Sequence, residues 1–422
     1  MKRNTALVGA TPGGAPDAMV DATALSPATR RRGQIAMLVI NFLMYGGFFM
    51  VIPLVSIHYV EQLGFAAATV GLSLALRQLL QQGLTLGGGV LADQIGARAL
   101  IGAGVLLRAV GFAVLAFAIT PALLFVAMIL SALGGALFDA PSRAAMAALT
   151  EEHERAQYFS LVGVSGGLGM TLGPLLGAML LRLNFEAVAL GAAACFVFIG
   201  GLVLLLPPVR VAQGQQGMGD GLRMVGRDRT FLTFTALLMG YWFMWVQITL
   251  SLPLMAERLA GTTDAVGAIY ALNAGLTVLF QYPIIRFVEP RLQPMPTLIL
   301  GVAIMALGLG AVAIATSIPL LVGCVIVFTL GTILATPTQQ SVTAALADDR
   351  AFGSYFGVSA LALAFGGGLG NVAGGLLTDA ARANGLHGLP WLTYAMIGLA
   401  SAVGLAILAE ALRGHRTIKT MN

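Results

Sequence analysis

Charged side chains are scarce in this chain, and their scarcity excludes most classes of soluble protein. Only 10% of the 422 residues are Asp, Glu, Lys or Arg, while 58% are hydrophobic. A soluble domain carries roughly 25% charged residues. We therefore expect an integral membrane protein whose main partner is the lipid bilayer. The net charge of +5 does not indicate nucleic-acid binding, because the basic residues lie at the ends of apolar runs and form no stripe.

Cysteine and histidine are also few, which argues against a metal site and against an enzyme. The two cysteines, Cys195 and Cys324, lie inside apolar runs without metal or disulfide spacing. The four histidines are scattered at positions 58, 153, 387 and 415. No Gly-x-x-x-x-Gly-Lys-Ser/Thr loop for a nucleotide is present. We expect no metal, no cofactor and no enzymatic activity, and an ion gradient as the energy source.

Long apolar runs are abundant instead, and they predict an all-α membrane protein. A spanning helix needs roughly 20 apolar residues. Twelve such helices are expected, over 34–58, 68–92, 98–119, 121–145, 157–182, 185–206, 230–256, 264–288, 295–316, 318–342, 352–378 and 389–412. Pro121 and Pro319 each fall in the first turn of a predicted helix, where a missing backbone N–H removes no helical hydrogen bond.

A glycine stripe occurs twice, at positions 197 residues apart. Its members are Gly169, Gly173 and Gly177, and then Gly366, Gly370 and Gly374. Glycines four residues apart in a helix form one bare face that a neighbouring helix can approach closely. Pro174 is expected to bend the first of these helices, and Asn371 takes its place in the second. The flanking pair Tyr158-Phe159 also returns, as Tyr355-Phe356, so the chain is predicted to consist of two related halves.

The polar segments divide the chain into five parts. We expect a disordered cytoplasmic tail over 1–33, a six-helix bundle over 34–206, a cytoplasmic linker over 207–229, a second six-helix bundle over 230–412, and a cytoplasmic tail over 413–422. No apolar h-region follows Lys2-Arg3, so the first segment is not expected to be a cleaved signal peptide. With both termini cytoplasmic, the inner segments hold most of the Lys and Arg residues, whereas the outer segments hold only Arg182, Arg258 and Arg382. This asymmetry predicts the orientation.

The loop after the second predicted helix resembles a known signature. Residues 89–98 read Gly-Val-Leu-Ala-Asp-Gln-Ile-Gly-Ala-Arg, which is similar to the Gly-x-Leu-x-Asp-Arg-x-Gly-Arg-Arg/Lys motif of the major facilitator superfamily. The matching positions are Gly89, Leu91, Asp93, Gly96 and Arg98, while Gln94 and Ala97 replace two basic residues. Gly96 permits a sharp turn, and Asp93 can accept hydrogen bonds at a helix end or from an arginine.

The first glycine stripe resembles a second motif of the same superfamily, the fifth-helix antiporter signature Gly-x-x-x-Gly-Pro-x-x-Gly-Gly. Gly169, Gly173, Pro174 and Gly177 match it. Stretches at 48–57, 77–83 and 134–139 extend the resemblance to the drug:proton antiporter branch over about 34–412. The resemblance implies two six-helix bundles around a central cavity, and multidrug efflux of small lipophilic or cationic compounds in exchange for protons. It also implies a monomer in the cell inner membrane. The alternative is a transporter of a defined metabolite, such as a sugar, amino acid or organic acid, whose carboxylate Arg77 could clamp.

Polar residues inside the predicted helices are the candidate site, because each is costly in hydrocarbon and must face protein or water. The expected substrate cavity consists of Asn41, Tyr45, Arg77, Gln78, Gln81, Tyr241, Trp245, Asn273 and Gln281. For Arg77 and its neighbours the choice between cavity wall and interhelical network stays open, as does the choice between substrate contact and packing for the aromatic residues. Arg108 needs a partner that the sequence does not identify.

Asp139 is the carboxylate expected within the membrane. It could carry a proton, or pair with Arg143 four residues later and join Asp93 and Arg98 in a cytoplasmic gate, or do both. The first predicted helix has Asn41 and no acidic residue, so the position that carries the proton in many related antiporters cannot be transferred to this chain.

Overall fold

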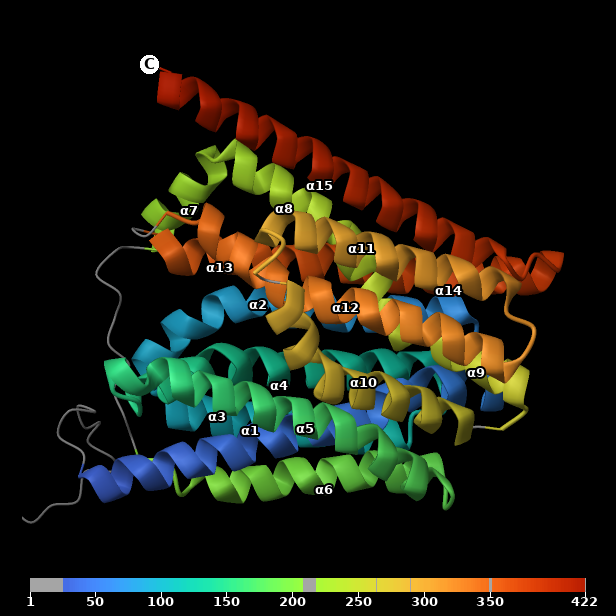
Figure 1. Cartoon of the computed structure of the whole chain (residues 1–422). Coiled ribbons are helices and arrows are strands. Elements are labelled where there is room, and N and C mark those ends of the chain that lie inside the picture. Colours follow the sequence, from blue (N-terminus) through green and yellow to red (C-terminus); the bar gives the residue numbers. More distant parts are fainter. Residues whose placement is uncertain (1–25, 208–217, 263, 289, 349–350, 422) are drawn as a thin grey trace, which may run out of the picture.

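The computed structural model describes residues 26–421 apart from 208–217, 263, 289 and 349–350, and this part of the chain is helical with no strand (Figure 1). The first half contains α1 (Pro27–Ser56), continued by the π-helical turn η2 (Ile57–Gln62), and then α2 (Ala67–Ile95), α3 (Ala97–Ala116), α4 (Pro121–Ala148), α5 (Arg155–Leu181) and α6 (Phe185–Val203). A short helix, α7 (Met218–Arg227), follows it.

The second half repeats this order with more interruptions. Its elements are α8 (Arg229–Trp245) with η4 (Val246–Ile248) and α9 (Ser251–Ala260), α10 (Asp264–Val288), α11 (Pro294–Ala311), α12 (Ile318–Leu346), α13 (Phe352–Ala362) with η7 (Leu363–Gly367) and α14 (Gly368–Asn384), and α15 (Leu389–Met421). Together these make twelve long helical segments, as predicted. The chain is therefore an all-α, multi-pass membrane protein.

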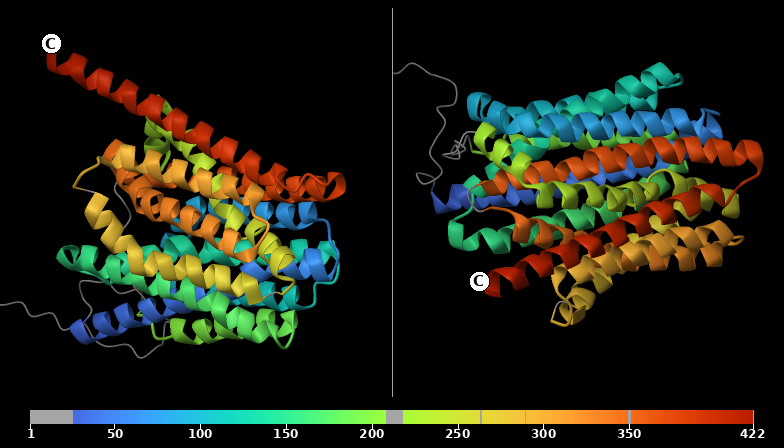
Figure 2. Two further views of the ribbon diagram at one scale, coloured as in Figure 1. Left: turned by 45° about the vertical axis from the view of Figure 1, so that its right-hand side comes forward. Right: turned by 90° about the horizontal axis from the view of Figure 1, so that it is seen from above.

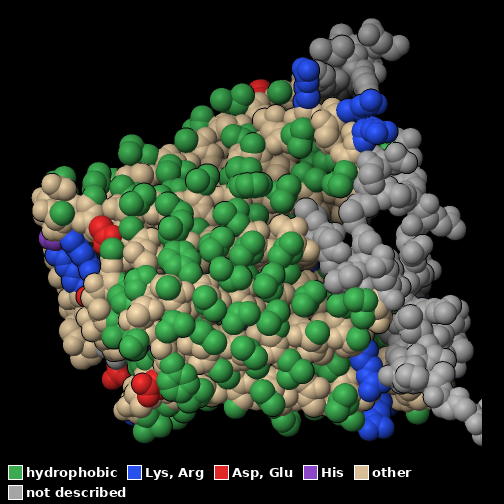
Figure 3. Space-filling view, turned by 180° about the vertical axis from the view of Figure 1, so that it is seen from behind, with side chains coloured by type: hydrophobic (Ala, Val, Ile, Leu, Met, Phe, Trp, Pro, Cys, Tyr) green, Lys and Arg blue, Asp and Glu red, His purple; other side chains and the backbone are tan. Residues whose placement is uncertain are grey.

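Eleven of these segments are long and apolar enough to cross a membrane, judged on the described residues. The twelfth, α2, is 29 residues long but carries Arg77, Gln78, Gln81 and Gln82 at its centre. A space-filling view shows apolar side chains over the middle of one face, with charged side chains gathered toward its two ends (Figure 3). This distribution is typical of a protein with an apolar membrane belt.

The glycine stripes form the predicted close contacts, and they do so in both halves. A Cβ on Gly173 would lie 2.5 Å from the carbonyl oxygen of Gly46 on α1, and a Cβ on Gly370 would lie 2.6 Å from that of Phe243 on α8. Phe243 follows Gly46 by 197 residues, the same interval that separates the two glycines. The repeat therefore extends to the surfaces that the stripes contact: α5 packs on α1, and α14 packs on α8.

The segment boundaries differ from prediction at three places. Helix α1 begins at Pro27, seven residues before the expected start, because Ser26 caps it: the Ser26 hydroxyl accepts from the Thr29 N–H at 3.2 Å. At the other end, α15 continues to Met421, through the segment predicted as a tail. Helix α7 occupies part of the predicted linker. The predicted disorder of residues 1–25 lies outside the described residues.

Local signals for helix starts and turns are confirmed. Pro121 and Pro319 stand in the first turns of α4 and α12. Gly96 joins α2 to α3 with a φ of 94°, a conformation that residues with a Cβ rarely adopt. Helix α5 is continuous through Pro174, whereas in the second half the π-helical turn η7 includes Gly366, the first glycine of the stripe. The predicted bend at Pro174 stays a prediction.

The helices run side by side along one direction, as two further views show (Figure 2), so their loops gather at two opposite ends. We call the end that bears Arg31, Arg143, Arg229 and Arg413 the arginine-rich end. The opposite end bears the α1–α2, α5–α6 and α9–α10 connections, and we call it the arginine-poor end. The described part of the chain holds Arg182, Arg258 and Arg382 there.

Candidate functional site

Gln81 on α2 is the centre of a buried polar network inside the first bundle. Its side-chain oxygen accepts from Arg77 Nη1 at 2.9 Å and from Arg108 Nη2 on α3 at 3.2 Å. Its amide nitrogen donates to Asp139 Oδ2 on α4 at 2.9 Å. One uncharged amide therefore connects two guanidinium groups to one carboxylate, across three helices.

An aromatic ring covers both guanidinium groups. The ring of Phe48 on α1 lies 4.9 Å from the Arg77 guanidinium carbon and 5.0 Å from that of Arg108. Arg77 is only 7% exposed and Arg108 only 4%. A cation on a ring face gains more when it is removed from water, so Phe48 partly compensates for the burial of two like charges.

The network leaves two buried polar groups without hydrogen-bond partners. Arg77 also donates from Nη2 to Gln78 Oε1 at 3.2 Å, and Arg108 Nε donates to the Ser131 carbonyl at 3.4 Å. The Nε–H of Arg77 is buried without a hydrogen-bond partner, as is the Ser131 hydroxyl. Buried polar groups without partners are rare in native structures, and here they lie beside two positive charges that face one negative charge.

Two adjacent glycines of α4 make room for this network. A Cβ on Gly135 would come within 2.5 Å of Arg108 Nη2 and 2.6 Å of Gln81 Cδ, and a Cβ on Gly134 would lie 2.6 Å from the Arg108 backbone nitrogen. In the sequence, the Gly134-Gly135 pair contributed only to the family resemblance. A pair of adjacent glycines inside a predicted helix could have indicated a bulky polar neighbour.

Asp139 does not form the predicted ion pair with Arg143. Among the described residues, the hydrogen-bonding partner of the Asp139 carboxylate is Gln81, and no ion pair joins Asp139 to Arg143, which is exposed at the arginine-rich end. Since both residues lie on α4, the four-residue spacing allowed the pair but did not require it. The structure places Asp139 with Arg77 and Arg108 instead.

Of the other predicted gate residues, Arg98 has a described contact at the end of α6. Arg98 Nη2 donates to the Leu204 carbonyl at the end of α6, at 3.0 Å. The side chain of Asp93 lies outside the described part of the structure. A gate formed by Asp93, Arg98, Asp139 and Arg143 together stays a prediction.

Two predicted cavity residues on α1 lie near the first glycine stripe. Asn41 is 5% exposed, and its amide donates to the Val162 carbonyl on α5 at 2.9 Å, so it links the two helices. Tyr45, one turn later, is 41% exposed although it lies in the middle of α1. Of the two, Tyr45 is available to a ligand in this conformation.

The predicted residues of the second bundle are further apart. Tyr241 is fully buried, and its hydroxyl shares a hydrogen bond of 2.8 Å with Thr336 on α12. Asn273 donates to the Thr329 hydroxyl at 2.9 Å. Trp245 and Gln281 are partly buried. The buried polar network of this bundle lies instead around Gln247, whose amide nitrogen donates to the Gly370 carbonyl at 2.9 Å and whose oxygen accepts from the Ser251 hydroxyl at 2.7 Å. Among the described residues, it holds no charged side chain.

A group that sequence reasoning missed joins the two bundles at the arginine-poor end. Asp379 on α14 accepts from the Ala67 and Ala68 N–H groups of α2, at 3.0 and 2.8 Å. Arg382 forms an ion pair with Glu61, and the Ser56 hydroxyl donates to the Thr249 carbonyl at 3.4 Å. These residues are more than 190 positions apart, so no local pattern could have paired them.

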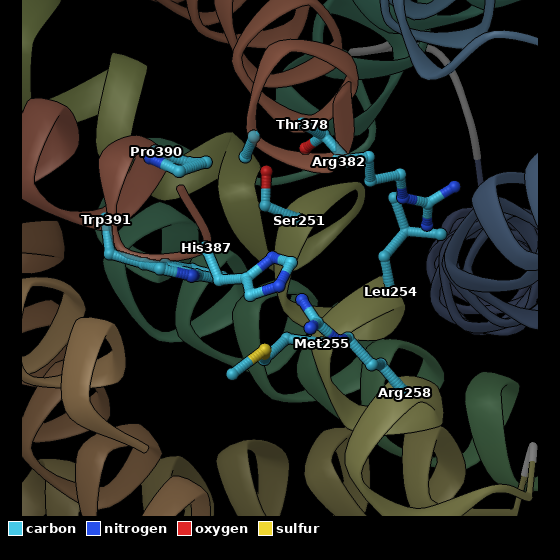
Figure 4. Close-up of a pocket in the computed structure, with 10 residues that line it drawn as sticks. Ser251, Leu254, Met255, Arg258, Thr378, Arg382, His387, Pro390 and Trp391 are labelled. Carbon is cyan, nitrogen blue, oxygen red and sulfur yellow. The ribbon is translucent and has the colours of Figure 1, made fainter. Parts of the chain in front are cut away.

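A pocket of the second bundle lies next to these contacts, between α9, α14 and α15. Figure 4 shows Arg258, Arg382 and His387 around it, with Ser251 and Trp391 on its wall. None of the predicted cavity residues lines this pocket. Arg382 therefore both lines this pocket and forms the ion pair with Glu61.

Comparisons with known proteins agree with the motifs. The model of the Major Facilitator Superfamily matches residues 37–371. The chain is 42% identical over 383 residues to the multidrug resistance protein MdtH of Yersinia enterocolitica, covering 90% of this chain and 96% of that protein. It is also 42% identical over 380 residues to MdtH of Edwardsiella ictaluri, covering 90% of this chain and 94% of that protein.

Solved structures show the same fold. A peptide transporter, POT, matches with a TM-score of 0.77 at 16% identity, covering 94% of this chain and 99% of that one. The nucleoside transporter NupG matches with a TM-score of 0.71 at 15% sequence identity, and the match covers 90% of this chain and 98% of that one. A third match is a bacterial homologue of the human lysosomal transporter Spinster, in an inward-facing and unoccupied conformation. Its TM-score is 0.74 at 16% sequence identity, and the match covers 91% of this chain and 96% of that one.

Proposed function

Because this chain belongs to the major facilitator superfamily and is a membrane transporter rather than an enzyme, we propose that it exports small amphiphilic compounds in exchange for protons. The observation that carries the proposal is the 42% identity to MdtH across 90% of the chain, since those relatives are multidrug resistance proteins. The buried network around Gln81 supports the proton-coupled part.

Asp139 is the group that we propose carries the proton. It is partly buried and is held by an uncharged amide, Gln81, rather than by direct contact with a guanidinium group. Protonating Asp139 would remove the one negative charge that faces Arg77 and Arg108. Like charges repel strongly where the dielectric constant is low, so protonation would weaken the present arrangement of α2, α3 and α4.

The arrangement of the bundles fits an alternating-access cycle. We propose that the arginine-rich end faces the cytoplasm, following the excess of positive charge in cytoplasmic loops, and that both termini lie on that side of a cell inner membrane. The polar contacts at the arginine-poor end then close the outer side. On this view the structure is an inward-facing conformation, ready to receive a compound from the cell.

Cells of an efflux-deficient host that express this protein should accumulate less of a lipophilic cationic dye than cells with an empty vector. A protonophore should abolish the difference, because no nucleotide-binding loop is present to supply energy. The measurement is dye fluorescence in whole cells, with and without protonophore. Dye export that persists after the proton gradient collapses would contradict proton coupling, and equal accumulation across a broad set of compounds would contradict drug export.

A second candidate is a transporter of a defined anionic metabolite. The specific observation in its favour is the buried excess of positive charge, because Arg77 and Arg108 face only Asp139 and the Arg77 Nε–H lacks an acceptor. A carboxylate could supply that acceptor. For the same cells, this candidate predicts unchanged accumulation of the cationic dye but altered accumulation of a labelled small organic acid.

A further inference from the structure

Helix α2 begins without a capping residue of its own. The residues around its start are Phe65, Ala66, Ala67 and Ala68, and none has a side chain that can accept a hydrogen bond. The first N–H groups of a helix have no partner within the helix. The Asp379 carboxylate meets this need from the opposite bundle, with one oxygen on each of the Ala67 and Ala68 N–H groups. A negative charge is also favourable at this end of the helix dipole.

Backbone packing brings the two helices close enough for this cap. A Cβ on Gly375 would lie 2.7 Å from the Ala68 Cα and closer still to the Ala67 carbonyl oxygen. A Cβ on Gly71 would lie 3.2 Å from the Asn371 carbonyl carbon and would overlap its oxygen. Glycine on each helix therefore allows α2 and α14 to touch at the backbone, one turn from the Asp379 cap.

At the repeat-related interface, between α5 and α10, the described residues show no such cap across the bundles. Arg182 stands 197 residues before Asp379, and Ala178 stands 197 residues before Gly375. At that interface the Ala178 Cβ lies 3.0 Å from the place of a Cβ on Gly267, so a methyl group separates the helices. The Asp379 carboxylate therefore occurs at only one of the two repeat-related interfaces, so the internal repeat does not account for it.

We infer that Asp379 is a gating residue, which closes the arginine-poor end by capping α2 across the bundle interface and must release α2 when that end opens. The inference rests on the proposed alternating-access cycle. The ion pair of Arg382 with Glu61 lies one turn of α14 beyond Asp379 and adds a second link across the same interface. Arg382 also lines the adjacent pocket (Figure 4).

Removing the cap should shift the conformational equilibrium without a need for any substrate. Replacing a helix cap by alanine changes an equilibrium by roughly 2- to 30-fold, so Asp379→Ala should raise the ratio of open to closed arginine-poor ends by about that factor. Asp379→Asn keeps one acceptor oxygen, so a smaller shift in the same direction is expected.

Distances between spin labels test this directly. Labels at Leu63→Cys and Leu386→Cys, both exposed at the arginine-poor end, are placed in purified protein whose Cys195 and Cys324 are replaced by alanine. Their distance distribution is then measured by pulsed electron paramagnetic resonance. The unaltered interface should give a predominantly short distance, and Asp379→Ala should add a longer one. Thr378→Val is the matched control, because the Thr378 hydroxyl bonds only within α14, to the Gly374 carbonyl at 2.7 Å.

An Asp379→Ala distribution equal to that of the unaltered protein would overturn the inference. If Asp379→Ala cannot be purified, an unchanged distribution in Asp379→Asn would overturn it in the same way. Because the measurement uses no substrate, its outcome is independent of whether the protein exports drugs. Conversely, if Asp379→Ala shifts the distance distribution but the unaltered protein exports no compound, the gating role of Asp379 would stand and the proposed export function would be rejected.

Discussion

Replacing Gly173 with valine should remove most of the folded protein from the membrane. A Cβ at this position would lie 2.5 Å from the Gly46 carbonyl oxygen and 3.1 Å from the Met50 backbone nitrogen. Both atoms belong to the backbone of α1, so no flexible side chain can move aside. Overpacking of a close-packed interior typically destabilises by about 1–3 kcal/mol, and valine against backbone should lie at or above that range. The measurement is the yield of monodisperse protein and its Tm in detergent.

A matched control lies on the same helix. A Cβ on Gly163 would have no neighbour within 4 Å, so Gly163→Val should leave yield and Tm nearly unchanged. Gly370→Val, at the repeat-related position against Phe243, should cause a loss similar to that of Gly173→Val. Equal effects of Gly163→Val and Gly173→Val would show that the stripe is not a packing surface.

Replacing Gln81 with leucine should reduce export by about 100-fold at equal expression. Leucine has a similar size, but it removes the hydrogen bonds to Arg77, Arg108 and Asp139 together. A hydrogen bond to a charged group is worth about 1.5–3 kcal/mol, which corresponds to roughly 10- to 100-fold for one bond. The buried charges would have to find other partners, and the link between Asp139 and the two arginines would be lost. The measurement is the initial rate of dye efflux per amount of protein in the membrane.

Gln82 provides the control for this experiment. It is the next residue of α2 and is partly buried, and its side chain has no hydrogen bond within the described residues. Gln82→Leu should therefore change efflux little. Equal losses in Gln81→Leu and Gln82→Leu would contradict a central role for the Gln81 amide.

Features set by local chemistry or by the repeat could be predicted from the sequence. The contact of Arg77 with Gln81 follows from their four-residue spacing on one helix. The packing of Gly173 follows from the periodicity of its stripe. The early start of α1 could have been predicted too, because Ser26 followed by Pro27 is a typical helix start.

Contacts between helices far apart in the sequence could not be predicted. Arg108 finds its partner, Gln81, on another helix, and a single sequence gives no information on how α2, α3 and α4 are rotated about their axes. The same limit explains why the sequence suggested only Arg143, its neighbour on α4, as an ion-pair partner for Asp139, and did not suggest the network around Gln81. Asp379 was missed because its partners are backbone N–H groups, which leave no signal in the sequence.

Transport by purified protein in liposomes tests the central claim most directly. An imposed pH gradient should drive accumulation of a dye in exchange for protons, with a proton flux that depends on the dye. Asp139→Asn should abolish accumulation driven by the pH gradient while it preserves exchange of labelled for unlabelled dye without a gradient. Accumulation by Asp139→Asn at the unaltered rate, still driven by the pH gradient, would contradict the assignment of the proton to Asp139.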